Sequence, residues 1–176
     1  MEKRNNRRPK KSKKEKLIWA LIILVIVIVG YGYMSSILKQ KYSETALIDS
    51  IEIAASDYKK DKYSKGTITY NSEDITENKK IILSEENIAK LLTQFEKTTV
   101  TGIKRKDIDA LNLKNSYTIE FDSNYGDDLV LFVGRDEISQ NVILDFMAFE
   151  KKLADKYLVQ DEETFYLIEE LVKQAP

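Results

Sequence analysis

The first candidate for chemistry is an oxygen-rich segment with the pattern Asp122-x-Asn124-x-Gly126-Asp127. Such segments bind calcium, but an EF-hand loop needs Asp or Asn at its fifth position, Gly at its sixth and Glu at its twelfth. Here the fifth position is Gly126, the sixth is Asp127 and the twelfth is Val133. Asn, Gly and Asp are also the residues that hairpin turns prefer. The segment therefore predicts a turn and no metal site.

Paired carboxylates are the second candidate, because two of them facing each other across a cleft can act as acid and base. Such pairs are numerous in the chain and include Glu85/Glu86, Asp107/Asp109, Asp127/Asp128 and Glu162/Glu163. Adjacency in the sequence does not make two groups face each other, and acidic residues at a helix start interact favourably with the helix dipole. We interpret the pairs as helix-start and surface residues.

The chain contains no histidine and no cysteine, and this removes several classes of chemistry. Disulfides, a lipid-modified cysteine anchor, zinc sites built from His or Cys, and Ser-His-Asp or Cys-His centres are all excluded. Ser64-Lys65 is expected in a solvated loop, where nothing would activate the lysine. We predict no enzyme, with no catalytic, cofactor-binding or metal-binding residue and no cofactor.

Basic residues are concentrated at the N-terminus, where residues 1–16 carry nine Lys/Arg against two Glu. The remaining 160 residues hold 19 basic and 27 acidic residues. A basic head and an acidic body indicate two different environments. A further basic cluster, Lys104-Arg105-Lys106, is interpreted as a solvated loop.

An apolar segment follows the basic head, and its 18 residues from Leu17 to Met34 carry no charge. Eleven of them are Leu, Ile or Val, which contribute roughly −3 to −6 kcal/mol to membrane insertion. With the uncharged residues up to Leu38, the segment spans roughly 27–33 Å as a helix, close to the thickness of a bilayer core. Trp19 near one end and Tyr31 and Tyr33 near the other suit the two interfaces. Residues 17–38 are therefore predicted to form a transmembrane helix.

The distribution of positive charge predicts the orientation of this helix. Nine basic residues precede it, whereas only Lys39 and Lys41 occur in the 20 or so residues after it. The positive-inside rule then places the N-terminus in the cytoplasm and the C-terminal domain outside. Anionic lipid headgroups are the expected partner of the basic tail. Nucleic acid is an alternative partner for a basic run, but membrane topology already accounts for the charge, so we expect none.

A cleaved signal peptide is the alternative to a permanent anchor. No Ala-x-Ala-like cleavage site follows the apolar segment, whose nearest small-residue pattern is Gly30-Tyr31-Gly32. Retention as a single-pass signal anchor is the prediction. The chain then divides into a basic cytoplasmic tail (1–16), a transmembrane helix (17–38), a juxtamembrane spacer (39–46) and an extracytoplasmic domain (47–176).

Alternating apolar and polar residues predict strands in the outer domain. They occur at Ile51–Ile53, Thr67–Tyr70 and Tyr117–Phe121. Leu129–Val133 is more fully apolar and is expected to form a hairpin with Tyr117–Phe121, and Lys79–Leu83 is a shorter strand candidate. Tyr70, Tyr117, Phe121, Phe132 and Phe165 are expected in the core.

Two helices are predicted in the same domain. Ser84 would cap the first, with an apolar stripe at Ile88, Leu91, Leu92 and Phe95. Asp161 would cap the second, whose stripe is Phe165, Ile168, Leu171 and Val172. Residues 138–159 are ambiguous, because Val142–Leu144 favours a strand whereas Phe146, Phe149, Leu153 and Tyr157 fit a helix. The predicted fold class is α+β with a largely antiparallel sheet.

This layout resembles that of small anchored or secreted α+β proteins from Gram-positive bacteria of the Firmicutes type. The resemblance rests on the basic tail, the single helix, the YTIEF…LVLFV hairpin and the C-terminal FYLIEELV helix. Residues 47–173 are similar in layout to YhfM-like domains. The resemblance implies a cell-envelope protein and brings no active-site residues with it.

Three functions are open at this point. The first is a membrane-tethered, non-enzymatic domain that binds an envelope protein or a cell-wall component. The second is a scaffold subunit of a conjugation, secretion or division machine, although no sustained heptads follow Leu38 as a coiled coil would require. The third is an enzyme that uses oxygen ligands.

Overall fold

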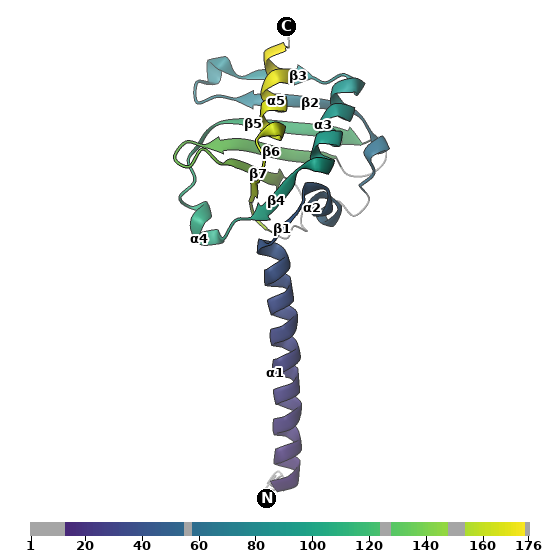
Figure 1. Ribbon diagram of the computed structural model, residues 1–176, viewed down its shortest axis with the longest axis vertical. Coiled ribbons are helices and arrows are strands. Elements are labelled where there is room, and N and C mark those ends of the chain that lie inside the picture. The colour runs from purple at the N-terminus through teal and green to yellow at the C-terminus, as the bar shows by residue number, and fades with distance from the viewer. Residues whose placement is uncertain (1–12, 55–57, 124–127, 148–153, 175–176) are drawn as a thin grey trace, which may run out of the picture. The chain divides into compact units, whose positions relative to one another are not determined.

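The computed structural model describes residues 13–54, 58–123, 128–147 and 154–174. Its contacts divide the chain into two compact units, residues 1–39 and residues 40–176. The fold class is α+β, as predicted: a long apolar helix is followed by an eight-stranded antiparallel sheet and further helices (Figure 1).

The N-terminal helix α1 spans Lys13–Tyr42 and is 30 residues long. Its most apolar part has a mean hydropathy of 2.5, and none of that part is buried against the rest of the protein. Large apolar side chains between Leu17 and Met34 are 42–78% exposed. The helix is thus long and apolar enough to cross a membrane.

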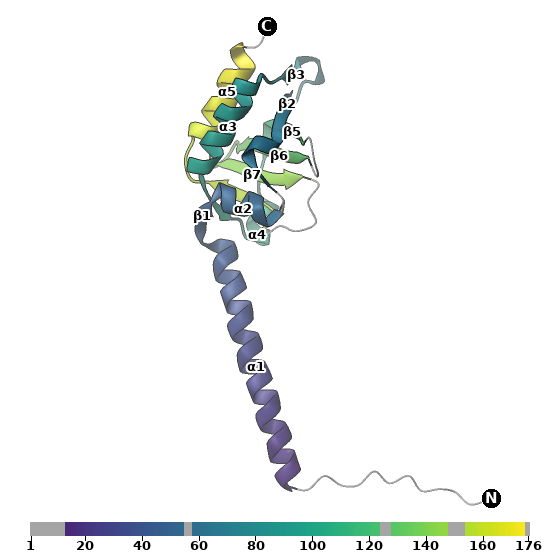
Figure 2. The ribbon, with the colours of Figure 1, turned by 90° about the vertical axis from the view of Figure 1, so that its right-hand side faces the viewer.

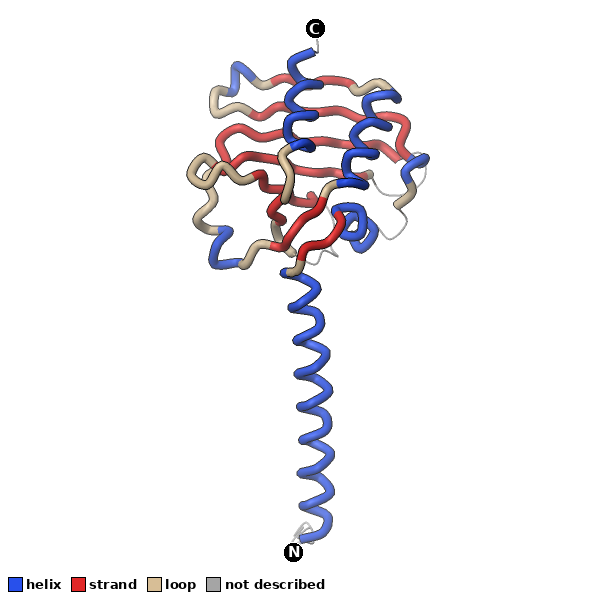
Figure 3. Tube along the Cα trace, in the orientation of Figure 1, coloured by secondary structure: helices blue, strands red, loops and turns tan. Residues whose placement is uncertain are grey.

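The strands, drawn in red in Figure 3, form one sheet. The sheet has eight strands in the order β1-β4-β8-β7-β6-β5-β2-β3, and every neighbouring pair is antiparallel. The strands are β1 (Glu44–Ala46), β2 (Tyr63–Asn71), β3 (Lys79–Ile82), β4 (Thr99–Gly102), β5 (Leu113–Ser123), β6 (Leu129–Asp136), β7 (Val142–Met147) and β8 (Tyr157–Val159). β1 and β3 are therefore the two edges of the sheet.

Helices α3 (Glu85–Lys97) and α5 (Glu163–Gln174) lie side by side on one face of the sheet (Figures 1 and 2). Two shorter helices, α2 (Leu47–Ala54) and α4 (Arg105–Ile108), and two 3₁₀ turns, η1 (Lys60–Lys62) and η2 (Ile75–Glu77), complete the described elements. The helix-bearing face and the apolar faces of α3 and α5 enclose the core.

The register of β5 and β6 shows why this face is apolar. Ile119 pairs with Leu131 and Phe121 with Leu129, and all four side chains are fully buried. Successive residues of a strand point to opposite faces, so alternation in both strands places these side chains on one face. The predicted strands at Thr67–Tyr70, Lys79–Leu83, Tyr117–Phe121 and Leu129–Val133 and the pairing of the last two are confirmed, whereas turn residues 124–127 lie outside the described part of the chain.

Helix α3 begins as its sequence predicts. The Ser84 hydroxyl accepts a hydrogen bond from the Asn87 N–H at 3.2 Å, which satisfies one of the helix's free N-terminal donors. The four residues of its predicted stripe are at most 1% exposed, and Phe95 meets Phe121 edge-on at 6.2 Å. The stripe of α5 is likewise buried, and Phe165 meets Tyr117 at 5.6 Å.

The predicted strand at Ile51–Ile53 is wrong, because these residues belong to helix α2. Leu47, Ser50 and Ile51 are the buried residues of α2, and their i, i+3, i+4 spacing is that of one helix face. The short alternation Ile51-Glu52-Ile53 satisfied the strand pattern by chance. Part of the predicted spacer at 39–46 is also structured, since α1 runs to Tyr42 and Glu44–Ala46 form β1.

Two further expectations need adjustment. Asp161 was expected to cap the last helix, but α5 begins at Glu163. The residue directly before the helix is therefore Glu162, whose carbonyl accepts the N–H of Tyr166 at 3.0 Å. Phe132 is only partly buried, because it lies on the sheet face opposite to that of Leu131 and Val133.

The ambiguous region 138–159 contains strands β7 and β8, which settles Phe146 and Tyr157 as strand residues. Their rings pack edge-on at 5.3 Å. Phe149 and Leu153 lie outside the described residues.

Candidate functional site

A groove runs beside helix α5. It consists of two adjoining hollows that share Tyr70, Tyr117 and Glu169. The larger, of about 540 Å³, lies between α5, η2 and β3, and the smaller, of about 290 Å³, lies beside β5, β6 and the turn after β6. We call the two together the α5 groove.

The centre of the α5 groove is a tyrosine pair from neighbouring strands. Tyr70 of β2 pairs in register with Tyr117 of β5, and their rings lie 5.4 Å apart at an angle of 34°. Residues directly opposite each other on antiparallel strands share a face, so the register itself creates this pair. Tyr117 is 6% exposed and is held on its other side by Phe165.

The environment of Tyr117 determines what its hydroxyl can do. Burial, then the charge of Glu169, then the neighbouring Tyr70 raise the pKa of Tyr117 to about 12. Because the phenol stays neutral at physiological pH, it can donate and accept hydrogen bonds but cannot serve as a base. The Tyr117 hydroxyl is therefore suited to binding a ligand by hydrogen bonds.

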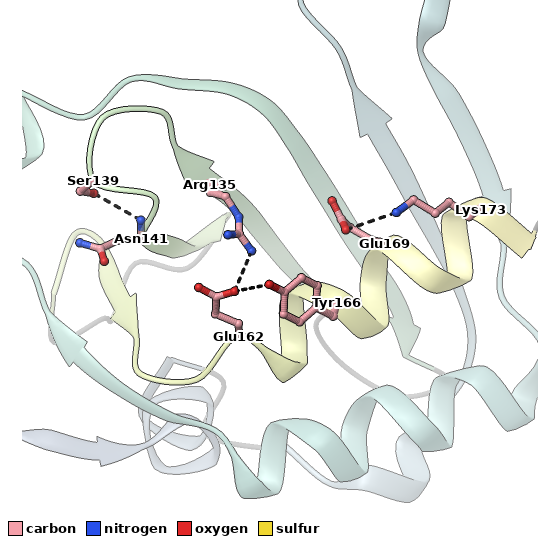
Figure 4. A network of polar contacts seen from close by, with 7 residues as sticks. All are labelled: Arg135, Ser139, Asn141, Glu162, Tyr166, Glu169 and Lys173. Carbon is pink, nitrogen blue, oxygen red and sulfur yellow. Dashed lines mark hydrogen bonds and ion pairs between the residues drawn. The ribbon is translucent and has the colours of Figure 1, made fainter.

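Arg135 of β6 lines the smaller hollow and is held in place from two sides. Its guanidinium lies 4.6 Å from the Phe165 ring centre and 5.6 Å from that of Tyr166. Its Nη2 is 3.3 Å from Glu162 Oε2, which also accepts the Tyr166 hydroxyl at 2.5 Å (Figure 4). The Tyr166 hydroxyl and, to a smaller degree, Arg135 lower the pKa of Glu162, so this carboxylate stays charged to lower pH than an ordinary glutamate.

The turn that follows Arg135 in the chain is held by several hydrogen bonds. The next residue, Asp136, is 3% exposed and accepts hydrogen bonds from the Asn112 N–H at 2.7 Å and from the Ser139 hydroxyl and N–H at 2.6 and 2.8 Å. The Ser139 hydroxyl, the Asn112 N–H and the Ser139 N–H together lower the pKa of Asp136. Gln140, which lines the smaller hollow, has a φ of 61°, so the turn holds it in the left-handed region.

Charged groups of both signs line the rest of the groove. Lys114 lies 3.3 Å from Glu137 and 3.5 Å from Glu73, and Glu137, more than Glu73, raises the pKa of Lys114. Lys173 lies 3.5 Å from Glu169 (Figure 4). These pairs are solvent-exposed and therefore contribute little to stability, which leaves them able to exchange partners with a ligand. The lining suits a ligand that carries both charge signs and some apolar surface.

The carboxylate pairs singled out in the sequence do not come together at this groove. Glu85 and Glu86 lie in the first turn of α3, and Asp107 and Asp109 lie at α4. Asp128 accepts the Ser123 N–H at 2.8 Å, as a turn residue does, whereas Asp127 is outside the described residues. Of the pair at the start of α5, Glu162 joins the Arg135 network and Glu163 lies 3.5 Å from Gln94.

The other residues singled out in the sequence lie on strands or at a helix start, away from the α5 groove. Ser64 and Lys65 lie on strand β2 and not in a loop, at a point where the register with β5 shifts. Lys104, Arg105 and Lys106 are exposed at the start of α4. Asp122 is exposed near the end of β5. Within the described ranges, no group of three acidic side chains is placed to hold a metal ion.

The α5 groove itself was not predicted from the sequence. Tyr70 and Tyr117 were assigned to the core, and Lys114, Arg135 and Glu169 were not singled out. The Tyr70–Tyr117 alignment depends on the pairing of β2 with β5. The chain between these strands, from the end of β2 at Asn71 to the start of β5 at Leu113, contains 41 residues. No local pattern contains that information.

The fold and groove define a class: an α+β protein whose N-terminal apolar helix is compatible with a transmembrane helix or a signal anchor. No protein-family model matches this chain, and neither a curated protein nor a solved structure matches it. The layout shared with YhfM-like domains therefore stays a prediction.

Proposed function

We propose that this chain is a membrane-anchored binding protein whose α5 groove holds an envelope protein or a cell-wall component outside the cytoplasm. In this proposal α1 is a permanent signal anchor and the basic N-terminal tail lies on anionic lipid headgroups in the cytoplasm. The function is non-enzymatic. The envelope setting follows the resemblance to the small anchored proteins of Gram-positive bacteria.

The observation that carries this proposal is the composition of the α5 groove. Tyrosine surfaces, which include the neutral hydroxyl of Tyr117, lie between cations and carboxylates that are only weakly paired. Hollows of hundreds of cubic ångströms with a few well-placed polar groups are typical binding sites. The apolar helix and its flanking charges support the anchor part of the proposal.

The absence of cysteine from the chain allows a clean test of topology. In intact cells, a membrane-impermeant maleimide should label an Ile138→Cys variant, whose residue 138 is 78% exposed, and should not label a Ser12→Cys variant. Both variants should be labelled after the cells are permeabilised. Labelling of Ser12→Cys alone in intact cells would reverse the proposed orientation, and free Ile138→Cys protein in the medium would indicate cleavage.

Site-specific photocrosslinking tests the binding part of the proposal. A benzophenone amino acid replaces Lys173 at the rim of the α5 groove or, as the control, Lys106 on α4, which does not line it. The proposal expects a crosslinked envelope protein or wall fragment from position 173 that is lost when Arg135 is changed to Ala. Equal crosslinking from both positions, or crosslinks only to a second copy of the chain, would count against the groove and favour a scaffold subunit.

A further inference from the structure

The edge strand β3 lies directly beside the larger hollow of the α5 groove. β3 pairs with β2 on one side and is the last strand of the sheet on the other (Figure 1). Lys79, the first residue of β3, lines the larger hollow together with Tyr70, its partner in the register. The unpaired edge and the hollow are therefore continuous.

The hydrogen-bond pattern identifies the backbone groups that face outward. The Leu83 N–H donates to the Gly66 carbonyl at 2.9 Å, so residues 66 and 83 form a hydrogen-bonded pair. Such pairs alternate along an antiparallel ladder, which makes Ile81 and Lys79 the next residues bonded to β2. The N–H and C=O groups of Lys80 and Ile82 consequently point away from the sheet, and together they offer two donors and two acceptors.

Side chains of β3 alternate between the two faces of the sheet. Lys79 and Ile81 face the helices, where Ile81 packs against the core, while Lys80 and Ile82 face the other side. Ile82 is 83% exposed, the largest exposed fraction among the large apolar side chains of the described residues. A strand added to β3 would cover Ile82 on one face and direct side chains towards the larger hollow on the other.

We propose that β3 and the larger hollow of the α5 groove bind an extended, acidic segment of another polypeptide by strand addition. This inference rests on the proposed function and specifies its ligand. Only an extended backbone can satisfy alternating donors and acceptors at a sheet edge. The residue opposite Lys80 would be acidic, and the residues opposite Lys79 and Ile81 would place apolar or aromatic side chains against Tyr70 and Val172.

Charge selects another polypeptide over a second copy of this chain. Lysines on a short edge strand discourage pairing between identical sheets, because like charges approach each other. Lys79 makes no ion pair within the described residues, and Lys80 has only an exposed contact with Glu120 at 3.4 Å. Lys80 is therefore available to a carboxylate of an incoming strand.

The test uses the full chain in lipid nanodiscs and a display library of random twelve-residue peptides. Peptides enriched on the wild-type protein are expected to be extended and to alternate acidic with apolar residues. One enriched peptide is then synthesised with a fluorophore and its Kd is measured by anisotropy. If no peptide is enriched, or the enriched peptides bind as helices, the strand-addition inference is overturned, while the crosslinking experiment above decides the proposed function separately.

The decisive variant is Ile82→Pro. It removes an outward N–H and leaves the ladder between β3 and β2 intact, since proline is tolerated at an edge where its nitrogen faces solvent. The Kd should weaken at least about tenfold, through loss of a backbone bond and a steric block. Ile82→Ser, which keeps the N–H, should weaken binding only about threefold or less, and Ile138→Ser, the matched exposed isoleucine, should have no effect.

Two alternatives to strand addition are misfolding of the Ile82→Pro variant and peptide binding in the α5 groove alone. An unchanged melting temperature of Ile82→Pro shows that the domain is folded, and Lys80→Glu supplies a second variant that should also weaken the acidic peptide. Enriched peptides that bind Ile82→Pro and the wild type equally, but lose affinity in Arg135→Ala, would overturn strand addition and leave the α5 groove as the binding site.

Discussion

Helix α1 and the pair α3 and α5 use the same apolar residue types in opposite ways. In α1, the leucine, isoleucine and valine side chains between Leu17 and Val29 occur around the whole helix and are 42–64% exposed. In α3 and α5 the apolar residues recur on one stripe, and those of the two predicted stripes are at most 9% exposed. A helix that is apolar all round requires an apolar solvent, whereas a striped helix requires a sheet or another helix as its partner.

The two units are therefore stabilised separately. The stripe residues of α3 and α5 pack on β5 through Phe95–Phe121 and Phe165–Tyr117 contacts. The most apolar part of α1 contributes nothing to that core, because none of it is buried. Changes in one unit should therefore leave the other intact, and the following predictions test that independence.

The largest effect is expected from placing two charges in α1. Val25→Arg combined with Ile28→Arg should cost roughly 5–7 kcal/mol of insertion free energy, about as much as the apolar residues contribute. The protein should leave the membrane fraction in a flotation assay, while the melting temperature of residues 40–176 stays the same. The double alanine variant is the control, and a double arginine variant that still floats with the membranes would contradict a spanning helix.

A core substitution should lower the stability of the C-terminal unit and leave membrane flotation unchanged. Phe121 is fully buried between Tyr63 and Phe95, at ring distances of 6.0 and 6.2 Å. Phe121→Ala should lower the free energy of unfolding by about 3–5 kcal/mol, through lost burial and the cavity left behind. Urea unfolding would measure this loss, and flotation should be unchanged. Ile138→Ala, at an exposed position, should change stability by less than about 0.5 kcal/mol.

A smaller effect is expected at the start of α3. Ser84→Ala removes the acceptor of the Asn87 N–H and should lower the free energy of unfolding by about 1 kcal/mol. Ser84→Asn should retain most of the stability, because asparagine caps helices about as well as serine. Equal losses in the two variants, measured by urea unfolding, would show that the cap is not the reason for the effect.

The smallest effect is confined to acid pH and concerns Asp136. Because hydrogen bonds from Ser139 and Asn112 lower its pKa in the folded state, Asp136 contributes stability that is present above the ordinary aspartate pKa. This contribution is lost as the pH falls through the lowered value. Asp136→Asn should therefore flatten the fall in stability between about pH 4 and pH 2, measured by thermal unfolding.

Sequence periodicity predicted the long, regular elements well and the short ones poorly. The stripes of α3 and α5 and the alternation in β5 extend over enough residues to exclude other periods. Ile51–Ile53 shows the limit, because three residues fit a strand and a helix equally, and the burial of Leu47 and Ile51 decided for the helix. Strands β1, β4 and β8 have three or four residues each, which is too short for a period to be recognised.

The candidate site required tertiary information for a different reason. Tyr70, Tyr117 and Arg135 follow ordinary strand periods, so their sequence indicates only which face they occupy. Their meeting beside Glu169 depends on the register of β2 with β5 and of β5 with β6. It also depends on where α5 crosses the sheet. Each of these is set by packing between distant segments.

Composition by itself identified a segment that is long and apolar enough to cross a membrane. The insertion propensity of an uncharged run with eleven Leu, Ile and Val residues beside a basic head follows from its sequence alone. Transfer into lipid depends on each side chain separately and not on contacts with distant segments. The absence of histidine and cysteine likewise excluded whole classes of chemistry. Only the tertiary structure decided which strand lies at the edge, which tyrosines form a groove and which backbone groups are left to pair, because these depend on contacts between residues far apart in the chain.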